Sequence, residues 1–185
     1  MNNKNYRALK KSYVEGDRMY YPTFFSKEYF LDYLLSTEQY WLRSYIKALR
    51  SEEYYTYIRV NKILKYYYFR KKNVLGRKLG IFIPSGCFEL GLHIAHYGSI
   101  IINPKARIGK NCTIHGNCCI GNKGNDDDGL PLIGNNVDIG QGAQILGNIE
   151  IADDVKIGAG SIVVHSIIED GVSVVGIPAK VVIKK

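Results

Sequence analysis

The hydrophobic residues of the chain follow two different periods, one in the first eighty residues and another in the rest. In the first part, apolar and aromatic residues recur at spacings of three and four, as at Trp41, Tyr45 and Leu49. This spacing is typical of amphipathic helices. Two helices are expected, one with Ser26 as its N-cap and a second that begins near Ser51, because serine hydroxyls cap helix N-termini.

The second part of the chain carries a six-residue repeat of aliphatic residues. A small or medium-sized residue often stands four positions later, as at Ala106. A helical period of 3.6 cannot produce this pattern, whereas three hexapeptides form one triangular coil, and such coils stack at the strand spacing of about 4.8 Å. The sequence therefore predicts a mainly β fold, a parallel β-helix with the repeated residues in its interior. These residues are Ile102, Ile108, Ile114, Ile120, Ile133, Ile139, Ile145, Ile151, Ile157 and Val163.

One interruption divides the repeat. The step from Ile120 to Ile133 is thirteen residues instead of six, so seven residues are expected to form an extruded loop within 122–132. An insertion into a solenoid projects from one face, often the binding face. The acidic stretch Asp126–Asp128 is either a metal site or a solvated tip. Consecutive carboxylates on a flexible loop are more often solvated, and no metal site is expected.

Composition and charge change at the same point as the hydrophobic period. Residues 1–80 contain 17 Lys and Arg against 7 Asp and Glu, and 14 of the 15 tyrosines. Residues 81–185 contain 8 Lys and Arg against 10 Asp and Glu, and 16 of the 19 glycines. The sequence predicts two domains, a basic, tyrosine-rich α-helical region over 1–80 and the β-helix over 81–185.

Composition also limits the class of protein. With 46% hydrophobic and 23% charged residues, the chain is close to the average of globular proteins, which excludes intrinsic disorder. No apolar stretch reaches the roughly 18 residues of a membrane span, and the polar, basic N-terminus is not a secretory signal. The cysteines are expected to be reduced thiols of a cytoplasmic protein, with Cys112 and Cys118 as small apolar residues at inward corners.

The run Lys65–Lys72 (KYYYFRKK) alternates aromatic and basic side chains and admits three interpretations. Its tyrosines can pack on the adjoining domain while its charges face water. Its side chains can instead lie at the anionic inner face of the plasma membrane, or stack on nucleic acid bases. The first interpretation is favoured, peripheral membrane contact stays open, and no nucleic acid partner is expected.

Four segments of the second region resemble the left-handed β-helix acyltransferases that use acetyl-CoA. Within them the chain looks most like the serine acetyltransferase branch, and closest to the O-acetyltransferases of bacterial capsule and exopolysaccharide gene clusters. The segments are GLHIAHYGSIIIN (91–103), TIHGNCCIGNKG (113–124), ILGNIEIADDVKIGAGS (145–161) and GIPAKVV (176–182). The resemblance covers just over half of the chain. It implies a left-handed coil, acetyl-CoA as co-substrate and a homotrimer with active sites between protomers.

The resemblance also implies site residues. It places the general base at His96, where an imidazole can take the proton of an attacking hydroxyl, and His93 and His115 are expected to bind substrate. Counting back six residues from Ile102 also reaches His96, so either the first coil is irregular or the ring is displaced from the interior to a cleft. The acetyl-CoA groove is carried onto Gly121, Asn122, Ala143, Ala159, Gly160 and Lys180.

Two departures from the serine acetyltransferases indicate a different acceptor. Those enzymes carry an aspartate directly before the catalytic histidine, where this chain has Ala95, and a second active-site histidine where it has Leu130. Zwitterionic serine needs such polar groups, whereas a sugar hydroxyl needs no charge pair. The expected function is acetyl transfer to the hydroxyl of a saccharide acceptor in cell-surface polysaccharide biosynthesis, with serine O-acetyltransferase as the alternative.

Overall fold

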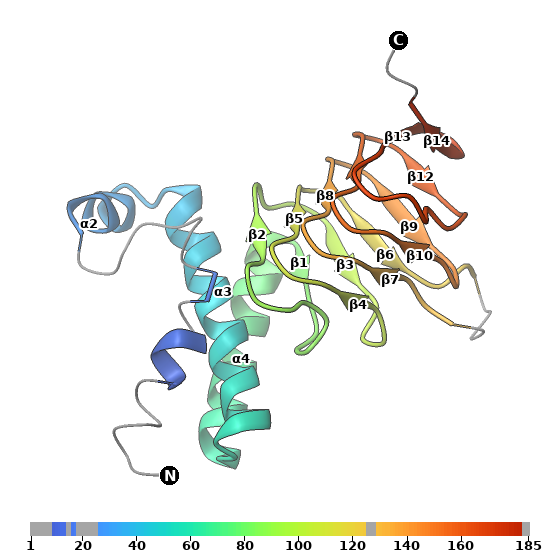
Figure 1. Cartoon of the computed structure of the whole chain (residues 1–185). Helices are drawn as coiled ribbons and strands as arrows, with labels where there is room; N and C mark the ends of the chain where they lie inside the picture. The colour runs from blue at the N-terminus through green and yellow to red at the C-terminus, as the bar shows by residue number, and fades with distance from the viewer. Residues whose placement is uncertain (1–8, 14–15, 18–25, 125–128, 183–185) are drawn as a thin grey trace. The chain divides into compact units, whose positions relative to one another are not determined.

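The structure is a computed structural model that describes residues 9–13, 16–17, 26–124 and 129–182. The chain divides into two compact units, Met1–Leu79 and Gly80–Lys185 (Figure 1). The acidic stretch Asp126–Asp128 lies outside the described residues. Within the described ranges, no helix combines the length and the apolar character needed to cross a bilayer.

Helices build the first unit. They are α2 (Lys27–Leu34), α3 (Glu38–Glu53), the π-helical turn η2 (Tyr54–Ile58) and α4 (Lys62–Leu79). Ser26 caps α2 as predicted, since its hydroxyl accepts a hydrogen bond of 3.1 Å from the Tyr29 N–H. The predicted helix start at Ser51 is wrong, because Ser51 lies buried inside α3. Asn61 stands before α4 instead, and its Oδ1 accepts a hydrogen bond of 3.0 Å from the Leu64 N–H.

Five charged side chains are buried in two groups inside the helical unit, and together we call them the buried cluster. The Arg50 guanidinium donates to Asp17 (Nε to Oδ2, 2.7 Å) and to Glu53 (Nη1 to Oε2, 2.8 Å). The Lys72 Nζ lies 2.8 Å from Glu52 Oε2. Burial disfavours the charged guanidinium, but the neighbouring carboxylates outweigh burial and raise the pKa of Arg50 above its ordinary value.

The buried cluster corrects the interpretation of the basic, aromatic run. Lys72 does not face water, because Glu52 on α3 pairs with it. Tyr68 stacks on Tyr55 within the same unit, with ring centroids 5.7 Å apart. Among the remaining basic residues of the run, Lys71 is exposed. The expectation that the charges face water is therefore wrong for Lys72.

The second unit is a prism of three stacks of short strands (Figure 1). The first sheet contains β1 (Ile81–Phe82), β3 (Ile100–Ile102), β6 (Cys119–Gly121), β9 (Gln144–Leu146) and β12 (Ile162–Val163). The second contains β4 (Arg107–Ile108), β7 (Leu132–Ile133) and β10 (Glu150–Ile151). The third contains β2 (His93–Ile94), β5 (Thr113–Ile114), β8 (Asp138–Ile139), β11 (Lys156–Ile157), β13 (Ser173–Gly176) and β14 (Ala179–Val181). The coils pair in parallel, and β14 folds back on β13 as an antiparallel strand.

Burial and strand register confirm the hexapeptide repeat. The ten repeated aliphatic residues are each at most 5% exposed. Ile102 pairs with Ile120, eighteen residues further on, whereas Ile108 pairs with Ile133, twenty-five residues further on. The difference of seven residues equals the insertion between Ile120 and Ile133. Each coil therefore keeps its register across the inserted segment.

The first coil is irregular. Ile94 pairs with Ile114, twenty residues further on, and is fully buried. Ile94 rather than His96 therefore fills the interior position of this coil. His96 comes two residues later, in the turn that follows β2, and its side chain is exposed. Of the two alternatives left by the sequence, the irregular first coil is the one observed. This irregularity places the imidazole of His96 at the surface.

Turn residues of two kinds connect the sheets. A glycine directly after an interior residue lets coils stack closely, since a Cβ added at Gly140 would lie 2.7 Å from the Ala159 N. Three positions after the interior residues Ile108, Ile133 and Ile157, the backbone is left-handed, with φ of 55° at Asn111, 56° at Asn136 and 68° at Gly160. Glycine and asparagine tolerate this conformation best, which explains their recurrence in the repeat.

Candidate active site

Successive turns stack along one corner of the β-helix, where strands of the third sheet pass into strands of the first. The Gly142 N–H donates to the Gly116 carbonyl at 3.0 Å, and the Gly160 N–H donates to the Gln141 carbonyl at 2.8 Å. These bonds join three consecutive coils at the same corner. We call it the histidine corner, and it comprises turns 95–99, 115–118, 140–143 and 158–161.

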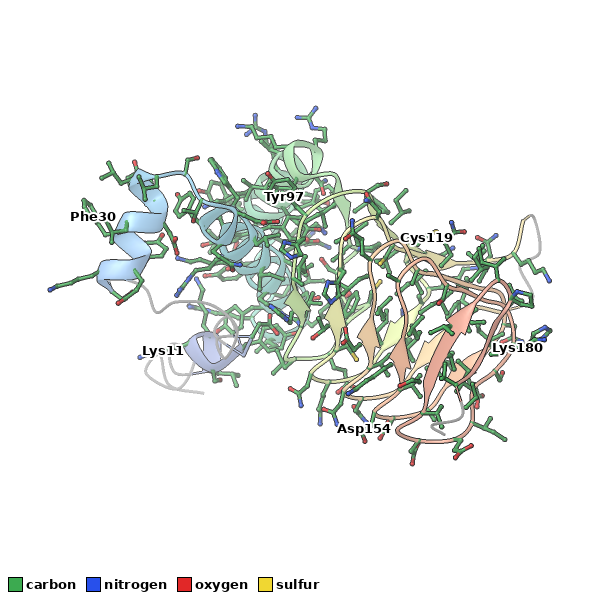
Figure 2. All side chains as sticks on the ribbon, turned by 90° about the horizontal axis from the view of Figure 1, so that it is seen from above. Lys11, Phe30, Tyr97, Cys119, Asp154 and Lys180 are labelled. Carbon is green, nitrogen blue, oxygen red and sulfur yellow. The ribbon has the colours of Figure 1, made fainter. Side chains whose placement is uncertain are left out.

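Two of the three expected histidines meet at the histidine corner. His96 lies in its first turn and His115 in its second, and their ring centroids are 6.3 Å apart. His96 is exposed and His115 is half-buried. Figure 2 shows Tyr97, the residue after His96, at the opposite end of the β-helix from Lys180. A small hydroxyl compound therefore has access to two imidazoles at one place on the surface.

The third expected histidine, His93, belongs to a row of residues on the outer face of the third sheet. His93 on β2 pairs with Thr113 on β5, and Thr113 pairs with Asp138 on β8. Asp138 pairs in turn with Lys156 on β11. The Thr113 Oγ1 lies 3.4 Å from the His93 Nδ1. This row places a carboxylate within two strands of His93 and next to the histidine corner.

Asp138 is the site residue that sequence analysis missed. Its Oδ1 lies 3.4 Å from the Nε2 of His115. Oδ1 is buried and makes no hydrogen bond within the described part of the chain, so its contact with His115 is not a hydrogen bond. A signal was present, because Asp138 directly precedes an interior isoleucine, as His93 precedes Ile94. A residue directly before an interior isoleucine points outward from the sheet. That Asp138 lies in the same row as His93 follows only from the strand pairing, because the first coil has an irregular offset.

The surroundings of His93 favour its neutral form. Its pKa is lowered below the ordinary value first by burial and then by the charged forms of His115 and His96, while Asp138 acts in the opposite direction. A neutral imidazole keeps one nitrogen as a hydrogen-bond acceptor. The cluster therefore offers acceptors as well as donors to a polar ligand.

The residues expected to line the acetyl-CoA groove divide into exposed and buried positions. Ala159 and Gly160 are exposed in the last turn of the histidine corner, and a Cβ added at Gly160 would meet nothing within 4 Å. Ala143 is fully buried; its N–H donates to Gly140 and its carbonyl accepts from Cys119. Ala143 thus fills an inward corner of the coil, and its place in the groove stays a prediction.

Two of the other expected groove residues, Gly121 and Asn122, lie away from the histidine corner. Gly121 and Asn122 lie where the first sheet passes toward the second, and the Gly121 carbonyl accepts from the Gly147 N–H at 2.9 Å. Asn122 is half-buried, and its Oδ1 accepts a long hydrogen bond of 3.5 Å from Asn103 Nδ2. Lys180 on β14 is exposed. Within one copy of the chain, the expected groove is therefore spread over two corners of the prism.

The buried cysteines lie at inward corners, as expected. Cys112 and Cys118 are 0% and 1% exposed. Burial raises the pKa of the Cys112 thiol to about 11, so this thiol stays protonated at neutral pH. In the described ranges, no group of three His, Cys, Asp or Glu side chains is placed to hold a metal ion.

Curated relatives of the chain are serine acetyltransferases. That of Bacillus licheniformis is 31% identical over 153 residues, which cover 77% of this chain and 70% of the relative. That of Synechococcus elongatus is 38% identical over 100 residues (54% and 41%), and that of Staphylococcus xylosus is 39% identical over 126 residues (62% and 57%). The chain spans about half the length of the latter two. No family profile matches the chain.

Solved structures share the fold. A serine acetyltransferase in complex with CoA superposes with a TM-score of 0.67 at 22% identity, covering 97% of this chain and 71% of the other. The serine acetyltransferase of Neisseria gonorrhoeae in complex with serine has a TM-score of 0.63 at 26% identity, covering 98% and 70%. The left-handed parallel β-helix with helices before it, predicted from the repeats and the resemblance, is confirmed.

These comparisons correct two expectations. The relatives and structures described above are serine acetyltransferases, so both a closest resemblance to capsule or exopolysaccharide O-acetyltransferases and a sugar hydroxyl as acceptor are wrong. The expectation rested on Ala95 and Leu130, which lack the polar groups usual at those positions. Polar groups missing at two sequence positions are a weak guide, because other residues can supply them to the same surface.

Proposed function

Since the chain belongs to the serine acetyltransferase family, we propose that it transfers the acetyl group of acetyl-CoA to the hydroxyl of L-serine. The observation that carries this proposal is the exposed imidazole of His96 beside a second imidazole, that of His115, at 6.3 Å. The reaction needs a base for a hydroxyl and an open surface on which a thioester can lie. The histidine corner offers both.

His96 is the proposed general base. A hydroxyl is a weak nucleophile at neutral pH, and a neutral imidazole within hydrogen-bond reach accepts its proton as the oxygen attacks. Attack on the thioester carbonyl gives a tetrahedral oxyanion, which backbone N–H groups can stabilise. When the C–S bond breaks, the imidazolium returns the proton to the leaving CoA thiolate. The products are the O-acetyl ester and a free thiol, and His96 is neutral again.

The later turns of the histidine corner are the proposed binding groove for acetyl-CoA. Ala159 and Gly160 are exposed and carry little side chain, so an extended pantetheine arm can approach the backbone closely. Lys180 supplies a positive charge for a phosphate group. This groove lies on the corner that carries His96, which lets one ligand reach the imidazole.

A homotrimer with active sites between protomers accounts for the spread of the expected residues over two corners. Gly121 and Asn122 lie at the corner between the first and second sheets. Two corners of one prism point in different directions. Both can contact one ligand only if neighbouring copies contribute them, as a closed cyclic oligomer allows.

The proposed function is tested by thiol release from acetyl-CoA. We expect L-serine to release one thiol for each O-acetylserine formed, and L-alanine, which lacks the hydroxyl, to release none above background. Mass spectrometry of the product distinguishes transfer from hydrolysis. If the protein binds acetyl-CoA but does not acetylate L-serine, the proposed acceptor is wrong.

We also propose that the protein is cytoplasmic and that it contacts the anionic inner face of the plasma membrane. The basic residues that can make this contact are Arg70 and Lys71, which are exposed. Lys72 is buried in a salt bridge with Glu52. We expect more of the wild type than of Arg70→Gln/Lys71→Gln to co-sediment with vesicles that contain phosphatidylserine. Each basic residue near such a surface contributes about 1 kcal/mol to the free energy of membrane binding. Equal sedimentation of both proteins would rule out this contact.

A further inference from the structure

The proposed acceptor carries an ammonium group. The chain has no carboxylate for it directly before the proposed catalytic histidine, where serine acetyltransferases carry an aspartate. L-Serine presents a cationic amino group two bonds from its reacting hydroxymethyl carbon. An ammonium bound at a protein surface needs hydrogen-bond acceptors, and a carboxylate is the strongest of these. Position 95, directly before His96, is alanine and cannot serve. The acceptor must therefore find its carboxylate elsewhere at the histidine corner.

Asp138 lies where such a carboxylate is needed. It precedes the third turn of the histidine corner, and its Oδ1 lies 3.4 Å from His115 Nε2. The ring of His115 lies 6.3 Å from that of His96. These two contacts form a continuous series from Asp138 to the proposed general base, running over adjacent coils on one face.

The Asp138 side chain combines a buried oxygen with an open side. Oδ1 is buried without a hydrogen bond in the described residues, whereas the side chain as a whole is 51% exposed. A buried carboxylate oxygen without a donor is costly. The exposed part of the side chain leaves room for a cationic donor to approach the carboxylate from the surface.

We propose that Asp138, together with His115, recognises the cationic amino group of the acceptor. This inference rests on the proposed function and names the acceptor class more closely, as a hydroxyl compound with an amino group beside its hydroxymethyl carbon. Asp138 supplies the negative charge. His115 Nε2 faces Asp138, so a proton on Nε2 leaves Nδ1 with a lone pair that accepts a hydrogen bond from the ammonium.

Asp138 and His115 can explain how the chain binds L-serine although it lacks the aspartate and the second histidine that serine acetyltransferases carry at positions 95 and 130. The carboxylate and the imidazole missing at positions 95 and 130 are replaced by a carboxylate and an imidazole from β8 and from the turn after β5. Lys156 is next to Asp138 in the row on β11. Because a nearby cation competes with an ammonium for Asp138, Lys156→Gln is expected to leave the KM for L-serine unchanged or lower it.

The test is steady-state kinetics of Asp138→Asn. This change keeps the shape of the side chain and removes its charge. We expect the KM for L-serine to rise about tenfold to a hundredfold, the range that corresponds to loss of a hydrogen bond to a charged group. The kcat and the KM for acetyl-CoA are expected to change little, because His96 and the proposed binding groove for acetyl-CoA are intact in this variant. Asp138→Glu is expected to recover part of the loss.

Two comparisons make the result specific. Asp154→Asn is the matched control, because it removes an exposed carboxylate from a turn at another corner (Figure 2) and asparagine tolerates the left-handed φ of 60° there. The second comparison uses 3-hydroxypropanoate, which lacks the amino group. We expect Asp138→Asn to leave kcat/KM for this acceptor unchanged.

The outcomes separate this inference from the proposed function. If the wild type acetylates L-serine and Asp138→Asn keeps its KM, the inference is wrong and the proposed function stands. If the variant loses activity with both acceptors equally, Asp138 has a structural role, which also overturns the inference. His115→Gln repeats the test from the other partner and is expected to raise the KM for L-serine as well. If the wild type fails with L-serine, both proposals fall.

Discussion

Replacement of His96 by alanine is expected to lower kcat for acetyl transfer to L-serine about 10²- to 10⁴-fold, the usual contribution of a positioned general base. The side chain is exposed, so its loss leaves no cavity in the interior. The interior position of this coil is filled by Ile94. The loss should therefore be one of chemistry and not of folding. The measurement is thiol release from acetyl-CoA at saturating L-serine.

The matched control is His165→Ala. His165 is also an exposed histidine of the β-helix, but it follows β12, near the far end of the coil stack from His96. We expect this variant to keep wild-type kcat. A His96→Ala enzyme with nearly full activity would exclude His96 as the base, and His115 would become the next imidazole to test.

Replacement of Arg50 by methionine is expected to destabilise the helical unit by about 3–5 kcal/mol, because it leaves buried carboxylates without their counter-charge. Arg50 is 0% exposed, and Asp17 and Glu53, to which it donates, are each 1% exposed. Methionine fills much of the space but donates no hydrogen bond. Asp17 and Glu53 must then take up protons or water, and either costs free energy in the folded state.

The single tryptophan of the chain makes this measurement specific. Trp41 lies in α3, so its fluorescence during urea unfolding follows the helical unit. Arg77→Met is the control, since Arg77 is exposed in the last turn of α4, and we expect it to change stability little. The double variant Arg50→Met/Asp17→Leu should be less destabilised than Arg50→Met alone. Equal stability of Arg50→Met and the wild type would show that the buried cluster does not hold the unit together.

Much of the β-helix could be predicted because each coil repeats the same local solution. An aliphatic residue every sixth position fills the interior, so residues close together in the sequence determine the structure of the regular coils. Even the interruption before Ile133 leaves the register intact, since pairing resumes at Ile108 and Ile133. The first coil escaped prediction because its offset of twenty residues, between Ile94 and Ile114, has no counterpart in the repeat.

The helical unit was harder to predict from its sequence. Spacings of three and four identified helices, but Ser51 suggested a helix start in the middle of α3. A capping residue and a buried interior serine look alike in sequence, and packing against other helices decides between them. The charges of Arg50 and Lys72 likewise suggest solvent, and their burial depends on partners such as Asp17, thirty-three residues away from Arg50.

The candidate site shows the same division. The motif around His96 and the family resemblance are local in sequence, so the proposed base and the acetyl-CoA chemistry follow from a few consecutive residues. The pairing of His115 with Asp138 joins residues twenty-three positions apart, and it arises from a strand offset of twenty-five between β5 and β8. No short-range pattern encodes such a contact, because an inserted segment of arbitrary length separates the two strands. The winding of the coils brings the carboxylate to the imidazole, and that winding is visible only in the folded chain.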